Sequence, residues 1–575
     1  MTTAPIQQLN QIATPALSVR PPAGRWIMNS WFDQLLIVST PLLIIPIVYF
    51  IHSPLVGVDA ETIGLIVTAF FALGHHLPGM MRAYGDRDLF QRFHLRFIFA
   101  PPLLFIVFFP LYRFHYDVWR LTTMFWATWH GLMQLYGFVR IYDAKTGSIS
   151  RTTANLDWLM CLFWFSTITI FKQEKTSNLL ENFYSMGGPL LPPLAIRSFQ
   201  WICFAGSIVV LIAFLVNYII RSRKGPRPNP IKLVMLASGI GFFGFAMMCV
   251  ENPVLGVALF DISHDVQYLA IVWLYNCRRV VSNPSVGRFM KFVFRRGMSL
   301  LYVGVVVAYG AIGLVPSLIQ DETVKTIFTG ILWTSTILHY YYDGFIWKVR
   351  ESSTQATLGL NEEKKRTQIP QFVSGGYGHL LKWSPLILLV GWYLITDLTD
   401  QSLSIKAKKD LKREYTQQLA SSTKLPREIE AKSWLMTEFE RVQNIAAAVP
   451  SDQYAQLRAA IMLANFGRND EAIQRLDQQV KEHPGFSEGY TALGAIHLYR
   501  GNLDKASEYL QAALVHATTK HERSAANLKL GELCINQRDP ASAKAKFADA
   551  LKDNPELEAA VASVRKRNEM TNSSP

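Results

Sequence analysis

The sequence contains little cysteine, and none of it is arranged in a pattern that indicates chemistry. Only five cysteines occur in 575 residues, no two of them form a CxxC pair, and four fall in or beside apolar runs. A disulfide framework and a thiolate metal site are therefore not predicted. Residues 1–32 also lack the order of a signal peptide, so we expect a short flexible tail there.

A nucleic-acid-binding motif is also missing, although the net charge is +14. From Ser404 to the last residue, 25 Lys and Arg stand against 22 Asp and Glu, so only three of the excess positive charges lie there. The other eleven precede Ser404, mostly in short connections between apolar runs. Basic residues in such connections report membrane topology. We predict no nucleic-acid partner.

Long apolar runs are abundant as far as Leu398. Each is about 20 residues long, which is enough to cross the hydrocarbon core of a membrane. The sequence predicts an all-α protein in which residues 33–400 form a polytopic helical bundle in the lipid bilayer. The expected spans number about eleven and lie near residues 34–52, 61–83, 96–112, 118–141, 155–172, 198–221, 231–250, 256–277, 298–318, 325–348 and 380–398.

Basic residues divide unevenly between the two ends of these spans. On alternate connections, 26 Lys and Arg lie on one side and six on the other. The positive-inside rule then places the N-terminus in the cytoplasm. With an odd number of spans, the chain after Asp400 lies on the outer side, which is the periplasm if this is the inner membrane of a bacterium.

Beyond the membrane region, the composition becomes that of a soluble helical protein. Residues 401–450 are expected to form a charged helical connector, and residues 451–575 contain an internal repeat of about 34 residues. The recurring positions are Ala472, Ala506 and Ala543, then Leu476, Leu510 and Phe547, and finally Pro484 and Pro555. They resemble the tetratricopeptide repeat (TPR) over residues 453–556. The resemblance implies an α-solenoid that binds a protein partner in its groove.

Ionisable side chains interrupt four of the apolar runs. The segments are Gly74-His75-His76, Trp129-His130-Gly131, Ser263-His264-Asp265 and Leu338-His339. Such groups inside a membrane usually face the bundle interior or a wet cavity. Counted back from the inner basic residue of each helix, His75, His130 and His339 lie about 10, 15 and 13 Å above the cytoplasmic edge, and His264 about 21 Å. We expect three histidines in one layer and His264 about a turn above it.

Imidazoles beside carboxylates are ligands that iron, copper, zinc or manganese accept. The candidate metal ligands are His75, His76, His130, His264, Asp265 and His339. Further polar residues on the same helices are expected to orient ligands or contact a substrate, and they are Asp343, Gln134, Tyr268 and Arg82. The predicted cofactor is iron or another transition metal, with a haem between two facing histidines as the alternative.

Each of these residues also has a structural interpretation. A single histidine in a membrane helix is more often a hydrogen-bond partner of a neighbouring helix than a metal ligand. Arg82 and Arg140 fit anchors at the inner membrane edge, with Asp143 and Asp157 as partners of the arginines. Trp347 fits an interfacial aromatic belt.

Three functions follow from these alternatives. The first is a metal-dependent oxidoreductase that acts on a lipid or another hydrophobic substrate. The second is a metal-free transferase that moves an acyl or glycosyl group, with His130 or His339 as general base and Asp343 orienting it. Trp129-His130-Gly131 resembles the histidine region of the membrane-bound O-acyltransferases. The third is a non-enzymatic anchor or scaffold whose repeats dock an envelope assembly.

Overall fold

The computed structural model describes three main stretches of the chain. These are residues 24–348 without positions 115, 186, 187 and 225, residues 352–360, and residues 429–564, together with four single positions between 384 and 395. Within them the ordered elements are helices, and the only β-type pairing is one isolated bridge between Asp86 and Val286. The all-α prediction is confirmed for this part of the chain. The expected span at 380–398 and most of the connector at 401–450 lie outside it.

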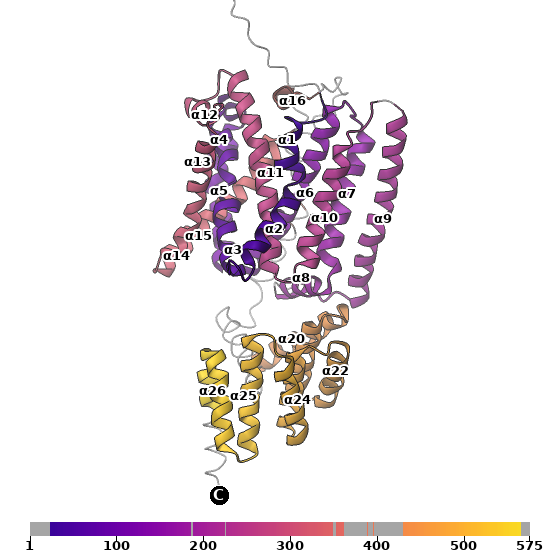
Figure 1. Cartoon of the computed structure of the whole chain (residues 1–575), viewed down its shortest axis with the longest axis vertical. Coiled ribbons are helices and arrows are strands. Elements are labelled where there is room, and N and C mark those ends of the chain that lie inside the picture. Colours follow the sequence, from indigo (N-terminus) through magenta and orange to yellow (C-terminus); the bar gives the residue numbers. More distant parts are fainter. Residues whose placement is uncertain are drawn as a thin grey trace, which may run out of the picture. The chain divides into compact units, whose positions relative to one another are not determined.

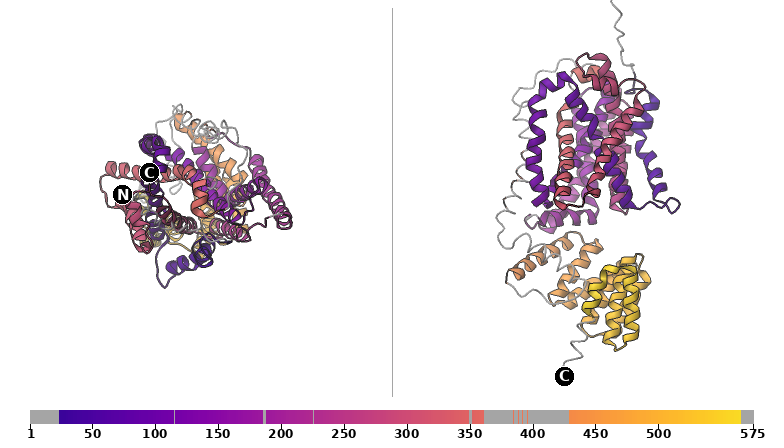
Figure 2. Two further views of the ribbon diagram at one scale, coloured as in Figure 1. Left: turned by 90° about the horizontal axis from the view of Figure 1, so that it is seen from above. Right: turned by 90° about the vertical axis from the view of Figure 1, so that its left-hand side faces the viewer.

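The chain divides into two compact units. The first comprises Met1–Ile168 and Cys203–Ser384, and the second comprises Thr169–Ile202 and Pro385–Pro575. The long helices of the first unit run roughly parallel or antiparallel to one another (Figures 1 and 2).

The helices of the N-terminal half vary widely in length. In chain order they are α1 (Ser30–Asp33), η1 (Gln34–Val38), α2 (Thr40–His52), α3 (Ala60–Ile66), η2 (Val67–Leu73), α4 (His76–Gly85), α5 (Arg87–Phe114), α6 (Tyr116–Lys145), α7 (Arg151–Phe171), α8 (Gln173–Ser185), α9 (Pro193–Arg223), α10 (Ile231–Gly244), η3 (Phe245–Cys249), α11 (Pro253–Ser282), α12 (Arg288–Val293), α13 (Ser299–Ala311), η4 (Ile312–Leu314), α14 (Val315–Leu318), α15 (Glu322–Ile346) and α16 (Ser352–Leu358).

Seven helices among the described residues are long and apolar enough to cross a membrane, rather than the eleven predicted. This indicates a membrane protein. The seven are Ala60–Gly85, Arg87–Arg113, Arg151–Phe171, Pro193–Arg223, Ile231–Cys249, Pro253–Ser282 and Ser299–Leu318.

Four of the eleven expected spans are not among these seven, for three different reasons. The first expected span is a pair of helices, Ser30–Val38 and Thr40–His52, that meet at a 54° bend and form at most one span. The expected span at 380–398 is outside the described residues. The helices α6 and α15 are long, but they carry so many His, Thr, Tyr and Trp side chains that their mean hydropathy is low. These two helices supply side chains to the candidate site.

A buried ion network joins α6, α7 and α10. Lys232 Nζ lies 2.7 Å from Asp143 Oδ2 and 2.8 Å from Asp157 Oδ1. Arg140 Nη1 donates to the same two carboxylates at 3.0 and 2.9 Å. The prediction that Asp143 and Asp157 partner an arginine is confirmed. Two cations balance two carboxylates, which is the condition under which buried charges are tolerated.

The second unit contains seven helices in a row within residues 429–553. They are α20 (Ile429–Ala448), α21 (Gln453–Asn465), α22 (Asn469–Glu482), α23 (Ser487–Tyr499), α24 (Leu503–His516), α25 (Lys520–Asn536) and α26 (Pro540–Asp553), followed by the turn η5 (Pro555–Leu557). Successive helices stand beside one another (Figure 2).

The small repeated residues of the sequence lie where these helices touch. Ala472 and Ala506 have no exposed surface, and Ala543 has 3 %. They lie in α22, α24 and α26, the second helix of each successive pair. At Gly494 in α23, an added Cβ would lie 2.5 Å from Leu510 Cγ. The repeat period therefore marks close helix contacts.

The connection between α7 and α9 belongs to the second unit. In this connection, Leu180 and Tyr184 of α8 pack against Ile445 and Val449 at the end of α20. The Tyr184 hydroxyl donates to Asn444 Oδ1 at 2.8 Å. The C-terminal helices and this connection therefore form one body.

This packing predicts that the C-terminal helices and α8 are reached from the same side of the membrane. In a variant without native cysteines, we would place single cysteines at Asn178 in α8, at Val515 in α24 and at Ser282 at the end of α11, all of which are exposed. An impermeant maleimide added to right-side-out vesicles should label Asn178→Cys and Val515→Cys alike. Because positive-inside counting puts the end of α11 on the opposite side, Ser282→Cys should react only after the vesicles are opened. Opposite accessibility of Asn178→Cys and Val515→Cys would contradict the packing.

Candidate metal centre

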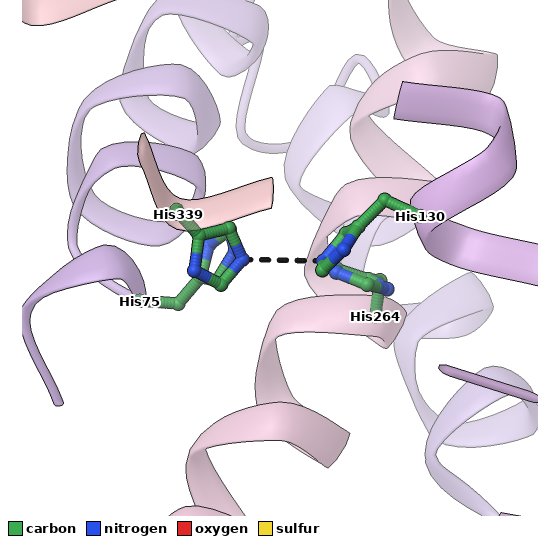
Figure 3. Close-up of side chains that lie close together, drawn as sticks. All are labelled: His75, His130, His264 and His339. Carbon is green, nitrogen blue, oxygen red and sulfur yellow. Dashed lines mark hydrogen bonds between the residues drawn. The ribbon is translucent and has the colours of Figure 1, made fainter. Parts of the chain in front are cut away.

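Four separate helices bring four histidine side chains together. His75 lies between η2 and α4, His130 in α6, His264 in α11 and His339 in α15. One ring nitrogen of each lies within 4.8 Å of one ring nitrogen of every other. Figure 3 shows the four rings facing a common centre. His264 was expected about a turn above the other three, and its ring nitrogen nevertheless lies within 4.8 Å of theirs. Residue counting measures depth only if helices are parallel and their basic ends are level.

His75 is positioned by the break between η2 and α4. Its Nδ1 lies 2.8 Å from Asp265 Oδ1 and 3.1 Å from the carbonyl oxygen of Phe71. Both partners only accept hydrogen bonds, so Nδ1 carries the proton and Nε2 presents its lone pair. Gly74 is required at this break, because a Cβ there would lie 2.2 Å from the carbonyl oxygen of Phe70.

The helix α15 contributes three groups at four-residue intervals on one face. His339, Asp343 and Trp347 follow one another along the axis. Asp343 Oδ1 accepts hydrogen bonds from the Tyr268 hydroxyl and from Trp347 Nε1, both at 3.0 Å. Asp343 Oδ2 lies 3.7 Å from His339 Nε2 and 4.0 Å from His130 Nε2. One oxygen of this carboxylate is therefore fixed, and the other faces the histidines.

The helices α6 and α11 meet at His130 and His264, whose ring centroids are 4.9 Å apart. Gly131 allows this approach, because a Cβ there would lie 2.7 Å from Phe260 Cζ. Gln134 Nε2 donates to the carbonyl oxygen of His264 at 2.9 Å and so links the two helices. A cavity of about 30 Å³ lined by Gln134 and His264 lies beside them, with room for about one water molecule.

The ring nitrogens at the centre cannot satisfy one another. His339 Nε2 lies 2.9 Å from His75 Nε2 and 3.1 Å from His130 Nε2. A neutral imidazole nitrogen has either one hydrogen or one lone pair in the ring plane, so it serves one of these contacts at a time. If His339 Nε2 is unprotonated, its lone pair faces that of His75; if it is protonated, two neighbours compete for one hydrogen. A shared cation removes the conflict.

The arrangement fits a single transition-metal ion. Metal–nitrogen bonds of about 2.0–2.1 Å set nitrogens about 3.4 Å apart in a tetrahedron and about 4.2 Å apart across a square. The four nitrogens lie within 4.8 Å of one another, so small ring rotations suffice. Neutral imidazole suits iron, copper, zinc and nickel. Asp265 bonded to His75 is the outer carboxylate that commonly orients a metal-bound histidine.

A haem fits this arrangement less well. Two axial histidines of a haem need the whole porphyrin plane between their coordinating nitrogens. The Nε2 atoms of His75 and His130 lie 2.9 and 3.1 Å from His339 Nε2, which leaves no room for a porphyrin between either pair. A bare ion needs no such space, so the geometry favours it.

Six of the ten candidate residues lie outside the group of four ring nitrogens, and His76 and Arg82 are the two not yet placed. The His76 ring stacks on His339 with centroids 4.8 Å apart, while its Nδ1 lies 3.2 Å from Ser335 Oγ. Arg82 stacks over Tyr275 and Trp347, at 4.1 and 4.0 Å from their ring centroids. Arg82 is only 3 % exposed, so it is not a solvated anchor at the membrane edge. Its nearest link to the histidines runs through Trp347 and Asp343.

Several residues of the site gave no clear signal in the sequence. Trp347 was interpreted as part of an aromatic belt, but its indole holds Asp343. Gly79 faces the site, and a Cβ there would lie 2.8 Å from the Tyr268 hydroxyl. Ser335, which contacts His76, also lies 2.8 Å from the Tyr309 hydroxyl. The signal that could have identified Ser335 is its spacing of four residues, one helical turn, from His339 in α15.

No known family model, curated protein or solved structure matches this chain. The TPR resemblance of residues 453–556 therefore gains no support from comparison and stays a prediction. The case for a function rests on the site's geometry.

The hydrogen bond between Asp265 and His75 provides a test of the centre. We expect Asp265→Asn to lower metal affinity about 10- to 100-fold, because the amide no longer fixes the protonated Nδ1 and the ring orientation. Metal retained after dialysis against graded chelator measures this change. The matched control is Asp261→Asn, one turn away in α11, which makes the same substitution at a carboxyl that does not contact a ring nitrogen of the four histidines and should retain the metal. Equal loss of metal in both variants would contradict a specific role of the Asp265–His75 hydrogen bond.

Proposed function

We propose that this protein is a membrane-embedded, metal-dependent oxidoreductase that acts on a lipid or another hydrophobic substrate. The observation that carries the proposal is the convergence of His75, His130, His264 and His339 with nitrogen contacts that neutral rings cannot all satisfy. These four residues would hold the ion. When bound, a redox-active ion supplies one-electron chemistry, and any ion supplies Lewis acidity.

The protein side chains around the ion would handle protons. Asp343 Oδ2 faces His130 and His339 while Tyr268 and Trp347 hold Oδ1. A carboxylate fixed in this way can take a proton from a group bound at the centre without moving its own backbone. Tyr268 would hold that carboxylate in position. Gln134 would maintain the spacing of α6 and α11.

A hydrophobic substrate is favoured by where the site lies. His75 is 4 % exposed and His339 is 2 % exposed. Two of the four histidines, His75 and His264, lie in segments long and apolar enough to cross a membrane. A solute dissolved in water would have to lose its hydration to reach them, whereas a molecule in the bilayer already has.

The C-terminal helices are proposed to be a TPR-like α-solenoid that docks a protein partner. The evidence for this proposal is that buried alanines recur where the helices touch, at Ala472, Ala506 and Ala543. Such arrays bind extended partners along a concave surface. With the N-terminus in the cytoplasm, the positive-inside rule puts α8 and the helices packed on it in the periplasm of a bacterial inner-membrane protein.

Two other functions compete with this proposal. A metal-free transferase would use one histidine as a base, so replacing the other three with Gln would leave activity intact. A non-enzymatic scaffold would depend on residues 429–564 and tolerate all four histidine replacements. The crowding of ring nitrogens favours the metal centre over both.

Metal analysis of the purified full-length protein tests the proposal directly. We expect close to one transition-metal ion per chain, identified by mass spectrometry, and its loss in the double variant His130→Ala, His339→Ala. The control is His94→Ala, an exposed histidine in α5 that contacts only a backbone carbonyl. Wild-type protein without a stoichiometric metal would reject the metal-dependent enzyme.

A further inference from the structure

A groove separates the start of α11 from α3 and η2. Its volume is about 500 Å³, and its lining residues are Glu61, Gly64, Val67, Thr68, Pro253, Val254, Val257, Ala258 and Asp261. Cavities of this size, about 300–1,000 Å³, are typical of sites for small molecules. No part of the metal centre described above lines it.

The walls of the groove are apolar and open toward the membrane. Val254 and Val257 are 39 % and 48 % exposed. They lie in a helix long and apolar enough to cross a membrane, where an exposed valine meets lipid tails. Gly64 leaves this part of the lining without a side chain, and a Cβ there would lie 2.6 Å from Val254 Cγ1, so any side chain at position 64 would enter the space beside Val254. A hydrocarbon chain in the bilayer therefore has direct access.

The ionisable groups of the groove are acidic, and its other polar side chain is Thr68. Glu61 and Asp261 line it, and no Lys, Arg or His is among its described lining residues. A carboxyl group in such a setting needs a hydrogen-bond donor or a cation as its partner. An anionic head group would face two carboxyls of like charge. The groove is therefore complementary to a chain that ends in a hydroxyl or an amine.

The groove leads toward the histidines along one face of α11. Asp261 and Asp265 are four residues apart, so they lie one above the other. Asp265 Oδ1 is bonded to His75, while Asp265 Oδ2 is buried and has no hydrogen-bond partner. A polar end group that enters past Asp261 comes next to this oxygen and then to the imidazoles.

We propose that this groove binds a single-chain hydrophobic molecule from the bilayer, with a hydroxyl or amine end group held by Asp261, and guides that end toward His75. The proposed binding depends only on the size and the lining residues of the groove. The statement that the bound molecule is the substrate rests on the proposed function.

Photo-crosslinking tests the binding step. Full-length protein in phosphatidylcholine nanodiscs is exposed to three 18-carbon probes, each with a diazirine in the chain and ending in an alcohol, an amine or a carboxylate. We expect the alcohol and amine to label the segments around Val67 and Val254–Ala258, mapped by mass spectrometry, at least about tenfold more than the carboxylate does. Equal labelling by all three probes would reject recognition by Asp261, and labelling elsewhere would reject the groove.

Substitutions separate groove binding from folding and from metal binding. Gly64→Leu and Val257→Trp each fill the groove and should lower labelling at least about tenfold, while Asp261→Leu should remove the preference for the alcohol and amine. The control is Gly304→Leu in α13, where an added Cβ has no neighbour within 4 Å. Metal content should stay at the wild-type level in all four variants. If the wild-type protein contains no metal but its groove is still labelled, only the proposed function is rejected. If labelling is unchanged in Val257→Trp, the proposal that the groove binds the probe is rejected.

Discussion

The central constraint in this structure is the shortage of hydrogens among three imidazole nitrogens. His339 Nε2 makes contacts of 2.9 and 3.1 Å with two other Nε2 atoms, although it can serve only one of them when the rings are neutral. Asp265 adds to this shortage, because it holds the proton of His75 on Nδ1 and leaves Nε2, which faces the other rings, without a hydrogen. The surrounding helices hold the rings in this arrangement instead of relaxing it.

That arrangement depends on close approach of backbones. Glycines stand at Gly74, Gly79 and Gly131, and a Cβ at any of them would collide with an atom within 3 Å. Small residues at helix contacts are how membrane helices approach closely. Here they bring α4, α6, α11 and α15 near enough for their histidines to meet. The same device recurs in the C-terminal helices, where Gly494 admits Leu510.

The polar site is screened by helices of a different composition. The segments Arg87–Arg113, Pro193–Arg223 and Ser299–Leu318 are strongly apolar, and each exposes most of its surface. They resemble conventional spans, whereas the four histidines come from segments that carry polar residues. Two of these, α6 and α15, fall below the apolar character of the seven spans, while Ala60–Gly85 and Pro253–Ser282 remain apolar enough to cross a membrane.

The sequence alone determined the helical class, the membrane character and the residues worth examining. Apolar runs of about 20 residues predict helices without knowledge of their neighbours, and a histidine within such a run is costly enough to attract notice by itself. Regular spacing likewise marked Ala472, Ala506 and Ala543 as contact positions.

Only the tertiary structure decided which of these residues meet. It brought a ring nitrogen of His264 within 4.8 Å of those of the other three histidines and placed His76 Nδ1 beside Ser335. It also showed that Trp347, which was expected in an aromatic belt, donates a hydrogen bond to Asp343. Helix tilt, bends and the rotation of each helix about its axis set these outcomes, and they depend on packing between segments far apart in the chain. Residue counting along one helix carries no information about that packing.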